Sequence, residues 1–183
     1  MKVRASFVVL SLSLASVAHA QSAEMPADYK GVLGTLIPQA PGGQNPTVVF
    51  VCEHGAAKSV IATAYFNKMA KERGLRARAT YRGVNPQAEL SADALKGLRD
   101  DGLPVPKERP SPIGAADVDK ATVIFAIGCT LPPRAVASGK ADSWNDVPGD
   151  QGYAAMRDAV KKHVERLVAD LLAQQRAPRK QSH

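Results

Sequence analysis

The feature that most constrains the fold of this chain is an apolar run that ends in a cysteine and a loop of small residues. Thr47–Val51 is continuously β-branched or aromatic, which is typical of a strand buried on both faces. Cys52 comes directly after it, and a helical pattern begins at Ser59. Free N–H groups of such a loop and of a helix's first turn attract an anion. The same field favours a thiolate, so Cys52 is a candidate nucleophile.

Strand and helix patterns alternate along the rest of the chain. The sequence predicts helices over residues 59–73, 91–98 and 152–174, and strands over residues 76–81 and 121–127. Ser91 suits a helix N-cap, whereas Leu103–Pro112 carries four prolines and excludes long regular structure. Alternation of this kind predicts a parallel sheet flanked by helices, with ligands bound at the carboxyl ends of its strands.

The two cysteines of the chain follow two of these predicted strands. Cys52 follows the first strand and Cys129 follows the strand at 121–127, so we expect both at one edge of the sheet. Two cysteines are too few for a disulfide scaffold, and no His, Cys and carboxylate cluster has the spacing of a metal site. Free cysteine also packs well as a small apolar residue, and this remains the alternative for each.

The ends of the chain carry signals that are separate from the domain. Residues 1–20 have a basic start, an apolar stretch too short to span a bilayer and an Ala-His-Ala ending, which predicts a signal peptide and a periplasmic or secreted protein. Residues 21–46 are rich in proline and predict an arm or linker, and residues 175–183 predict a basic, solvated tail. The net charge of +7 falls to +5 when Lys2 and Arg4 are removed, and no aromatic interleaving indicates nucleic-acid binding. We expect no membrane association after signal cleavage.

The segment from Cys52 to Ser59 resembles the Cys-x5-Arg-Ser loop of low-molecular-weight tyrosine phosphatases and thioredoxin-coupled arsenate reductases. The resemblance covers residues 47–172, and Lys58 stands where that family has arginine. It implies a single three-layer α/β domain over residues 47–174, with a four-stranded parallel sheet flanked by helices. It also implies an oxyanion bound by the loop, whose residues are Glu53, His54, Gly55, Ala56, Ala57 and Lys58.

The resemblance implies roles for further side chains. Cys52 would attack the phosphoryl or arsenate centre, Lys58 would supply positive charge, and Ser59 would cap the helix and donate to the thiolate. A late-loop aspartate would protonate the leaving oxygen, and Asp146 is the first choice over Asp150, although either could cap the following helix. His54 could tune Cys52 or be structural, and Glu53 is expected to face outward.

Three functions remain open at this point. The first is hydrolysis of phosphomonoesters, either phosphotyrosine or small molecules, and it needs no cofactor. The second is an arsenate reductase-like reaction in which Cys129 resolves oxidised Cys52 and a thiol reductant restores both. The third is an oxyanion-binding protein of weakened activity, because lysine lacks the planar fork with which arginine grips two oxygens.

Overall fold

The computed structural model describes residues 45–176 of the chain. The predicted signal peptide, nearly all of the predicted arm and most of the predicted tail lie outside the described residues and stay predictions. The first element begins at Thr47 and the last ends at Arg176. None of the helices in the described part is long and apolar enough to cross a membrane.

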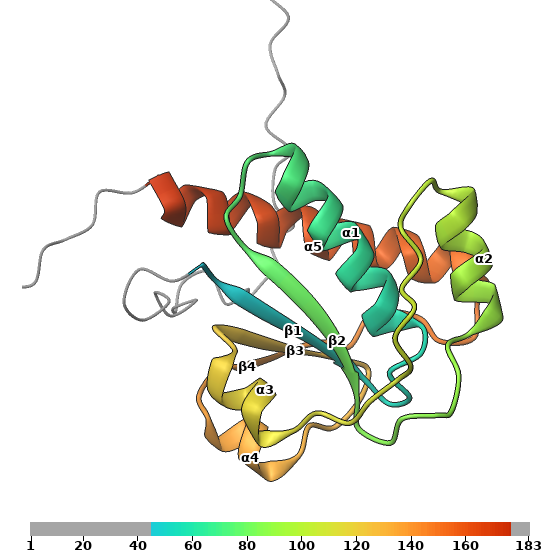
Figure 1. Ribbon diagram of the computed structural model, residues 1–183, viewed down its shortest axis with the longest axis horizontal. Helices are drawn as coiled ribbons and strands as arrows, with labels where there is room; N and C mark the ends of the chain where they lie inside the picture. Colours follow the sequence, from blue (N-terminus) through green and yellow to red (C-terminus); the bar gives the residue numbers. More distant parts are fainter. Residues whose placement is uncertain (1–44, 177–183) are drawn as a thin grey trace, which may run out of the picture. The chain divides into compact units, whose positions relative to one another are not determined.

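The core of the fold is a sheet of four parallel strands, β1 (Thr47–Cys52), β2 (Arg78–Gly83), β3 (Val123–Ile127) and β4 (Ala141–Trp144). The strand order is β2-β1-β3-β4, so β1 is central and lies between β2 and β3. The predicted four-stranded parallel α/β sheet is therefore confirmed. Figure 1 shows the strands running through the middle of the domain with helices on both sides.

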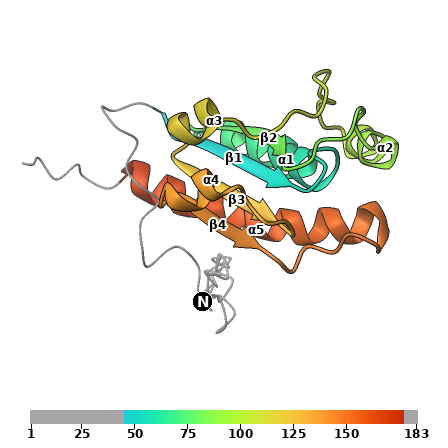
Figure 2. The same ribbon diagram turned by 90° about the horizontal axis from the view of Figure 1, so that it is seen from below.

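Helices cover the two faces of the sheet unequally. On one face lie α1 (Lys58–Glu72) and α5 (Gly152–Arg176), with α2 (Ala92–Asp100) beside them. The other face carries only two short helices, α3 (Ala115–Lys120) and α4 (Pro133–Ala137), and Figure 2 shows this three-layer arrangement from a second side.

Alternation along β1 builds a core on each face. Val48 and Phe50 pack toward α1 and α5, whereas Val49 and Val51 pack toward α3 and α4. Burial on both faces explains why this strand is apolar at every position rather than at every second one. On the α5 side, aromatic rings continue across the sheet, since Phe125 stacks on Phe50 at 5.8 Å between ring centroids.

Three elements of the structure were not located from the sequence. The helices α3 and α4 span only six and five residues, which is too short to show a helical period. The strand β4 is a short edge strand, and of its four residues only Trp144 is buried. Its polar composition gives no strand pattern, and it ends two residues before Asp146, the aspartate expected on a late loop.

The bounds of the other strands shift by up to two residues from the prediction. The second strand was placed at 76–81 and ended before Gly83, but Gly83 is its last residue. Glycine was interpreted as a breaker, whereas here it lies inside the strand because another backbone approaches it closely.

Candidate oxyanion site at the carboxyl edge of the sheet

The candidate nucleophile lies at the end of the central strand. Cys52 is the last residue of β1 and its side chain is only 5% exposed. Its Sγ lies 3.1 Å from Oγ of Ser59, which is fully buried. A hydroxyl at this distance can donate a hydrogen bond to the sulfur.

Ser59 does not cap α1, and that part of its predicted role is wrong. The helix begins at Lys58, its N-cap is Ala57, and no side chain caps it. As the second residue of the helix, Ser59 points back at the cysteine instead. The first turn of α1 therefore has free backbone donors that no side chain satisfies.

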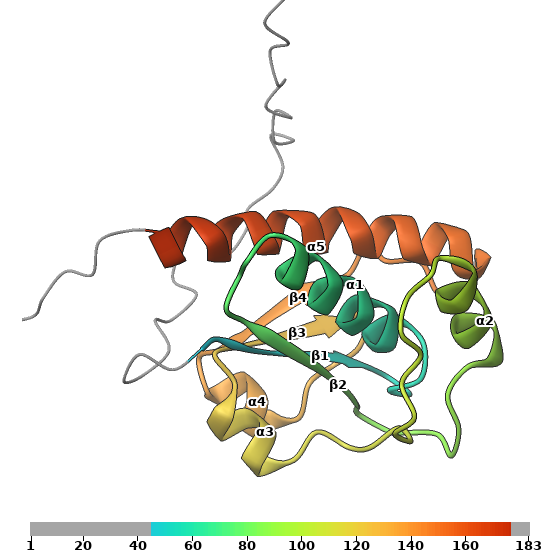
Figure 3. The same ribbon diagram turned by 45° about the horizontal axis from the view of Figure 1, so that its top comes forward.

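Hydrogen bonds hold the loop carbonyls away from the loop interior. The carbonyl oxygens of residues 52, 53, 54 and 56 accept from the N–H groups of residues 84, 85, 87 and 91, at 2.8 to 3.2 Å. These donors belong to the segment between β2 and α2, which Figure 3 shows at the same edge of the sheet. These four bonds fasten the loop to the segment that follows β2.

The N–H groups of the loop are free for a ligand. Among residues 45–176, the first amide after the loop that donates to a backbone carbonyl belongs to Ile61, whose acceptor is Ala57. The amides of residues 54–60 precede it and donate to no backbone carbonyl in the described part of the chain. They surround the end of a helix dipole, which is an arrangement suited to a phosphate-sized anion.

Two glycines allow the loop to approach β2. Gly55 has φ +61°, and a Cβ on it would lie 2.7 Å from the N of Gly83. A Cβ on Gly83 would in turn lie 2.9 Å from the N of Gly55. Both positions therefore require glycine, and the conformation of the anion loop depends on this contact.

Lys58 lies across the site rather than inside the loop. Its Nζ donates to the carbonyl of Val147 at 2.9 Å, in the segment that follows β4. The same Nζ is 2.9 Å from where a Cβ of Gly128 would lie and 3.5 Å from that of Gly149. Lys58 thus links the cysteine loop to the segments after β3 and β4, with its charge at the carboxyl edge.

The other polar side chains of the loop contact one asparagine. The Glu53 carboxylate accepts from Asn85 Nδ2 at 2.6 Å, and Nδ1 of the exposed His54 lies 3.4 Å from the Asn85 carbonyl. Neither contact involves Cys52. Ala56 is buried and Ala57 packs against the core, so these loop residues offer a ligand their backbone rather than their side chains.

Cys129 shares the edge with Cys52 but packs on the other face of the sheet. The expectation of a common edge is confirmed, because Cys129 Sγ lies 3.5 Å from the carbonyl of Val51. Both thiols are free. Burial, followed by the neighbouring Cys52, raises the pKa of Cys129 to about 11. Cys129 packs with the α3 and α4 cluster, whereas Cys52 belongs to the α1 and α5 cluster.

The preferred aspartate is engaged elsewhere. Asp146 Oδ1 lies 2.7 Å from Nε2 of His163, and the carboxylate is 70% exposed. His163 comes from α5 and stacks on Trp144 at 4.7 Å between ring centroids. Asp150 is exposed as well. No sequence pattern pointed to His163, because its partners lie in β4 and in the segment after it.

A half-buried polar cluster joins three of the helices. Asp101 Oδ2 accepts hydrogen bonds from Tyr65 and Tyr153, each at 2.6 Å, and Oδ1 pairs with Arg157 at 3.3 Å. Burial alone would raise the pKa of Asp101, but these donors hold it below its usual value. Because its members come from α1, the end of α2 and α5, the cluster ties these helices together.

Within the described residues, no three His, Cys, Asp or Glu side chains gather as a metal ion would require. The chemistry of the site is therefore derived from the thiol, the hydroxyl, the loop amides and Lys58.

Comparisons with known proteins by sequence and by structure both find low-molecular-weight tyrosine phosphatases. Residues 47–132 match the family model of low molecular weight phosphotyrosine protein phosphatase. A low-molecular-weight protein tyrosine phosphatase from Bacillus subtilis has the same fold, with a TM-score of 0.61, 18% identity, and coverage of 71% of this chain and 99% of that one. No curated protein matches the chain.

Two arsenate reductases are similar as well. The thioredoxin-dependent enzyme from Corynebacterium glutamicum has a TM-score of 0.60 and 19% identity, and covers 73% of this chain and 65% of that one. The enzyme from Archaeoglobus fulgidus has a TM-score of 0.52 and 27% identity, and covers 67% of this chain and 98% of that one. The resemblance that the cysteine loop indicated is thereby confirmed, and the similar structures include both phosphatases and arsenate reductases.

Proposed function

We propose that this chain, whose residues 47–132 match the family model of low molecular weight phosphotyrosine protein phosphatase, hydrolyses phosphomonoesters with Cys52 as nucleophile. The observation that carries the proposal is the combination of a buried sulfur, a hydroxyl 3.1 Å away and a loop of free amides around them. The amides bind the non-bridging oxygens, and the Ser59 hydroxyl donates to the thiolate. The substrate class is a phosphotyrosine or a small phosphomonoester.

The reaction has two steps. In the first, the Cys52 thiolate attacks phosphorus, a sulfur–phosphorus bond forms, and the ester oxygen leaves as an alcohol after taking a proton. In the second, water attacks the phosphocysteine, inorganic phosphate leaves, and the thiolate is restored. Free loop amides stabilise the charge on the phosphoryl oxygens in both steps.

The positions of Lys58 and Asp146 support a slow reaction. Lys58 donates to Val147 and contributes charge at the edge of the site, but it provides no fork around two equatorial oxygens. Asp146 is held by His163, so the proton for the leaving oxygen depends on a movement of residues 145–150 or on Asp150. Since leaving-group protonation contributes roughly 10² to 10⁴-fold, we expect aryl phosphates with good leaving groups to react far faster than alkyl phosphates.

A thiol redox reaction on arsenate is the second candidate. Its supporting observation is that Cys52 and Cys129 reach the same edge of the sheet. Arsenate would be reduced to arsenite by two electrons from the two thiols, which would become a disulfide, and a thiol reductant would restore them. The pKa of Cys129 and its packing on the opposite face both disfavour this reaction.

A weakened protein that binds an oxyanion without turnover is the third candidate. The experiment that separates the three uses p-nitrophenyl phosphate, arsenate and inorganic phosphate on the wild type, Cys52→Ser and Cys129→Ser. Hydrolysis that is lost in Cys52→Ser and kept in Cys129→Ser supports the phosphatase. Arsenate-dependent loss of both thiols supports the reductase, and phosphate binding without either reaction supports the third candidate.

Lys58→Arg tests whether the missing arginine fork limits turnover. Restoring the fork adds one transition-state donor, worth roughly 3 kcal/mol, so we expect a rise of about 10²-fold in turnover. An unchanged rate in Lys58→Arg, with activity still dependent on Cys52, would show that Lys58 does not limit the reaction.

A further inference from the structure

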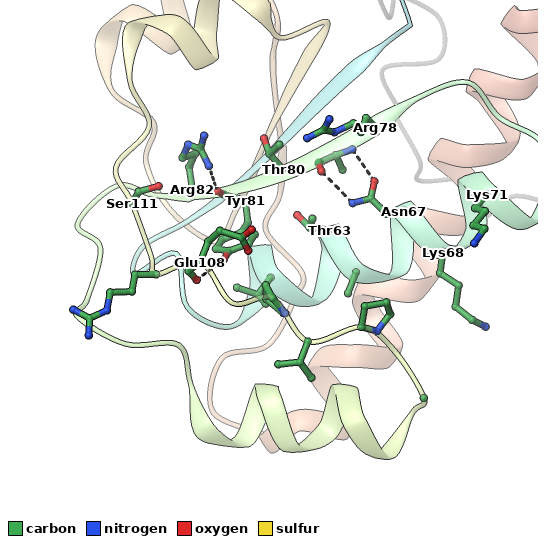
Figure 4. Close-up of a pocket in the computed structure, with 18 of the residues that line it drawn as sticks. Thr63, Asn67, Lys68, Lys71, Arg78, Thr80, Tyr81, Arg82, Glu108 and Ser111 are labelled. Carbon is green, nitrogen blue, oxygen red and sulfur yellow. Dashed lines mark hydrogen bonds between the residues drawn. The ribbon is translucent and has the colours of Figure 1, made fainter.

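A second cavity lies outside the cysteine loop. It has a volume of about 1060 Å³ and lies between α1, the edge strand β2 and the proline-rich segment 102–111 (Figure 4). None of residues 52–59 lines it. Its size falls at the upper end of the range for small-molecule sites. The cavity is therefore a candidate binding site separate from the anion loop.

The walls of this cavity are mainly apolar. Val60 and Ala64 of α1 face Tyr81 of β2, and Pro104 and Val105 cover them from the proline-rich segment. The Tyr81 hydroxyl donates to the carbonyl of Glu108 at 2.7 Å and so fastens this cover to the sheet. A cavity of this composition suits a ligand with an apolar body.

Positive charge collects at the rim. Three of the five rim cations are neutralised by carboxylates, as Lys68 pairs with Glu72, Arg82 with Asp117 and Arg109 with Glu89. Lys71 and Arg78 line the cavity and have no acidic partner within residues 45–176. Arg78 alternates with Ala79 and Tyr81, so its side chain lies on the face of β2 away from α1, the face that also carries Arg82. Figure 4 shows Lys71 at the end of the cavity opposite Glu108. Lys71 would attract an anionic group to this end.

One wall atom also lacks a partner. Thr63 Oγ1 is buried and makes no hydrogen bond with the described residues, and Thr63 lines the cavity. A buried hydroxyl without a partner costs about 1–3 kcal/mol. A ligand oxygen that reached it would offset this cost.

The edge of β2 excludes an added peptide strand as the occupant. The N–H and C=O of Ala79 are bonded to the side-chain amide of Asn67, and those of Gly83 to Ser111 and Ile113. The Tyr81 carbonyl between them accepts from Arg82. With these edge groups occupied, a strand-like partner would find few backbone bonds.

We propose that this cavity binds a small organic anion with an apolar body, such as a medium-chain carboxylate or its phosphate counterpart. The apolar body lies between α1 and the proline-rich segment, and the anionic group contacts Lys71. This site is separate from the cysteine loop, because none of residues 52–59 lines it.

The test is calorimetric titration of the full chain with dodecanoate, and with dodecan-1-ol as the uncharged probe. We expect saturable binding of one dodecanoate, weaker binding of the alcohol, and weaker dodecanoate binding in Ala64→Trp, which places an indole ring between α1 and the proline-rich segment. Lys71→Glu is expected to weaken binding about tenfold, from the loss of one charged contact. Lys120→Glu is the matched control, since Lys120 is an exposed cation of α3 remote from the cavity lining.

Two results would overturn the proposal. One is the absence of saturable dodecanoate binding. The other is an equal effect of Lys120→Glu and Lys71→Glu, which would indicate non-specific attraction. Lys71→Glu is a surface change, so it decides the matter even if Ala64→Trp fails to fold. Cys52→Ser is expected to retain dodecanoate binding whether or not Cys52 is the nucleophile, and its loss would place the ligand in the cysteine loop instead.

Discussion

Ser59→Ala isolates the contact that the proposed chemistry needs most. Ser59 is fully buried, so the change removes one oxygen without opening the site to solvent, and alanine suits a helix interior. The lost bond spans 3.1 Å to Cys52 Sγ. A hydrogen bond to a charged group is worth about 1.5–3 kcal/mol, which corresponds to a loss of about 10- to 100-fold in a reaction of the thiolate.

The assay is the rate of Cys52 alkylation by iodoacetamide at fixed pH, beside the hydrolysis of p-nitrophenyl phosphate. Ser91→Ala is the matched control, because it also removes a serine hydroxyl, the one that caps α2 at 3.3 Å from the N of Ala94. It should lower stability by about 1 kcal/mol and leave the alkylation rate unchanged. If Ser59→Ala reacted as fast as the wild type in both assays, the hydroxyl would have no role in holding the thiolate.

The remaining predictions concern the loop, the supporting cluster and the second thiol. Gly55→Ala should lower the free energy of unfolding by more than about 2 kcal/mol, as measured by urea titration, and should abolish phosphate binding. The reason is that a side chain is strained at φ +61° and meets the backbone of Gly83. Normal phosphate binding would contradict this. Asp101→Asn should be less stable than the wild type at pH 7, and the difference should shrink as pH falls below about 4, because a carboxyl whose pKa is depressed on folding loses its contribution when protonated. A constant difference from pH 7 to pH 3 would refute it. At pH 8 the Cys129 thiol, with its pKa near 11, should alkylate much more slowly than that of Cys52, which peptide mapping can follow.

The parts of the fold that the sequence could predict are those with strong periodic patterns. β1 was recognisable because it is buried on both faces, and Ser91 as a cap because a short polar side chain precedes a helical run. β4 and the short helices α3 and α4 escaped because five or six residues carry no period, and because an edge strand needs few apolar residues.

The site likewise has features that the order of elements along the chain predicts and contacts that it does not. The position of Cys52, the anion loop and the shared edge with Cys129 follow from order along the chain, since parallel strands end at one edge. The contacts of Lys58 and Asp146 could not be predicted, because Val147 and His163 reach them from distant segments. Ser59 was given two roles, and only tertiary structure shows that Ala57 occupies the cap and leaves the hydroxyl for the sulfur.

The proposed reaction requires that Cys52 becomes covalently phosphorylated inside the anion loop. Rapid acid quench of the chain with p-nitrophenyl phosphate, followed by peptide mass analysis, detects this phosphoryl group. The account predicts one phosphoryl group on the peptide that contains Cys52, less of it when inorganic phosphate competes, and none in Cys52→Ser. Hydrolysis of the substrate at full rate in Cys52→Ser, or a phosphoryl group on another residue of the wild type, would contradict it.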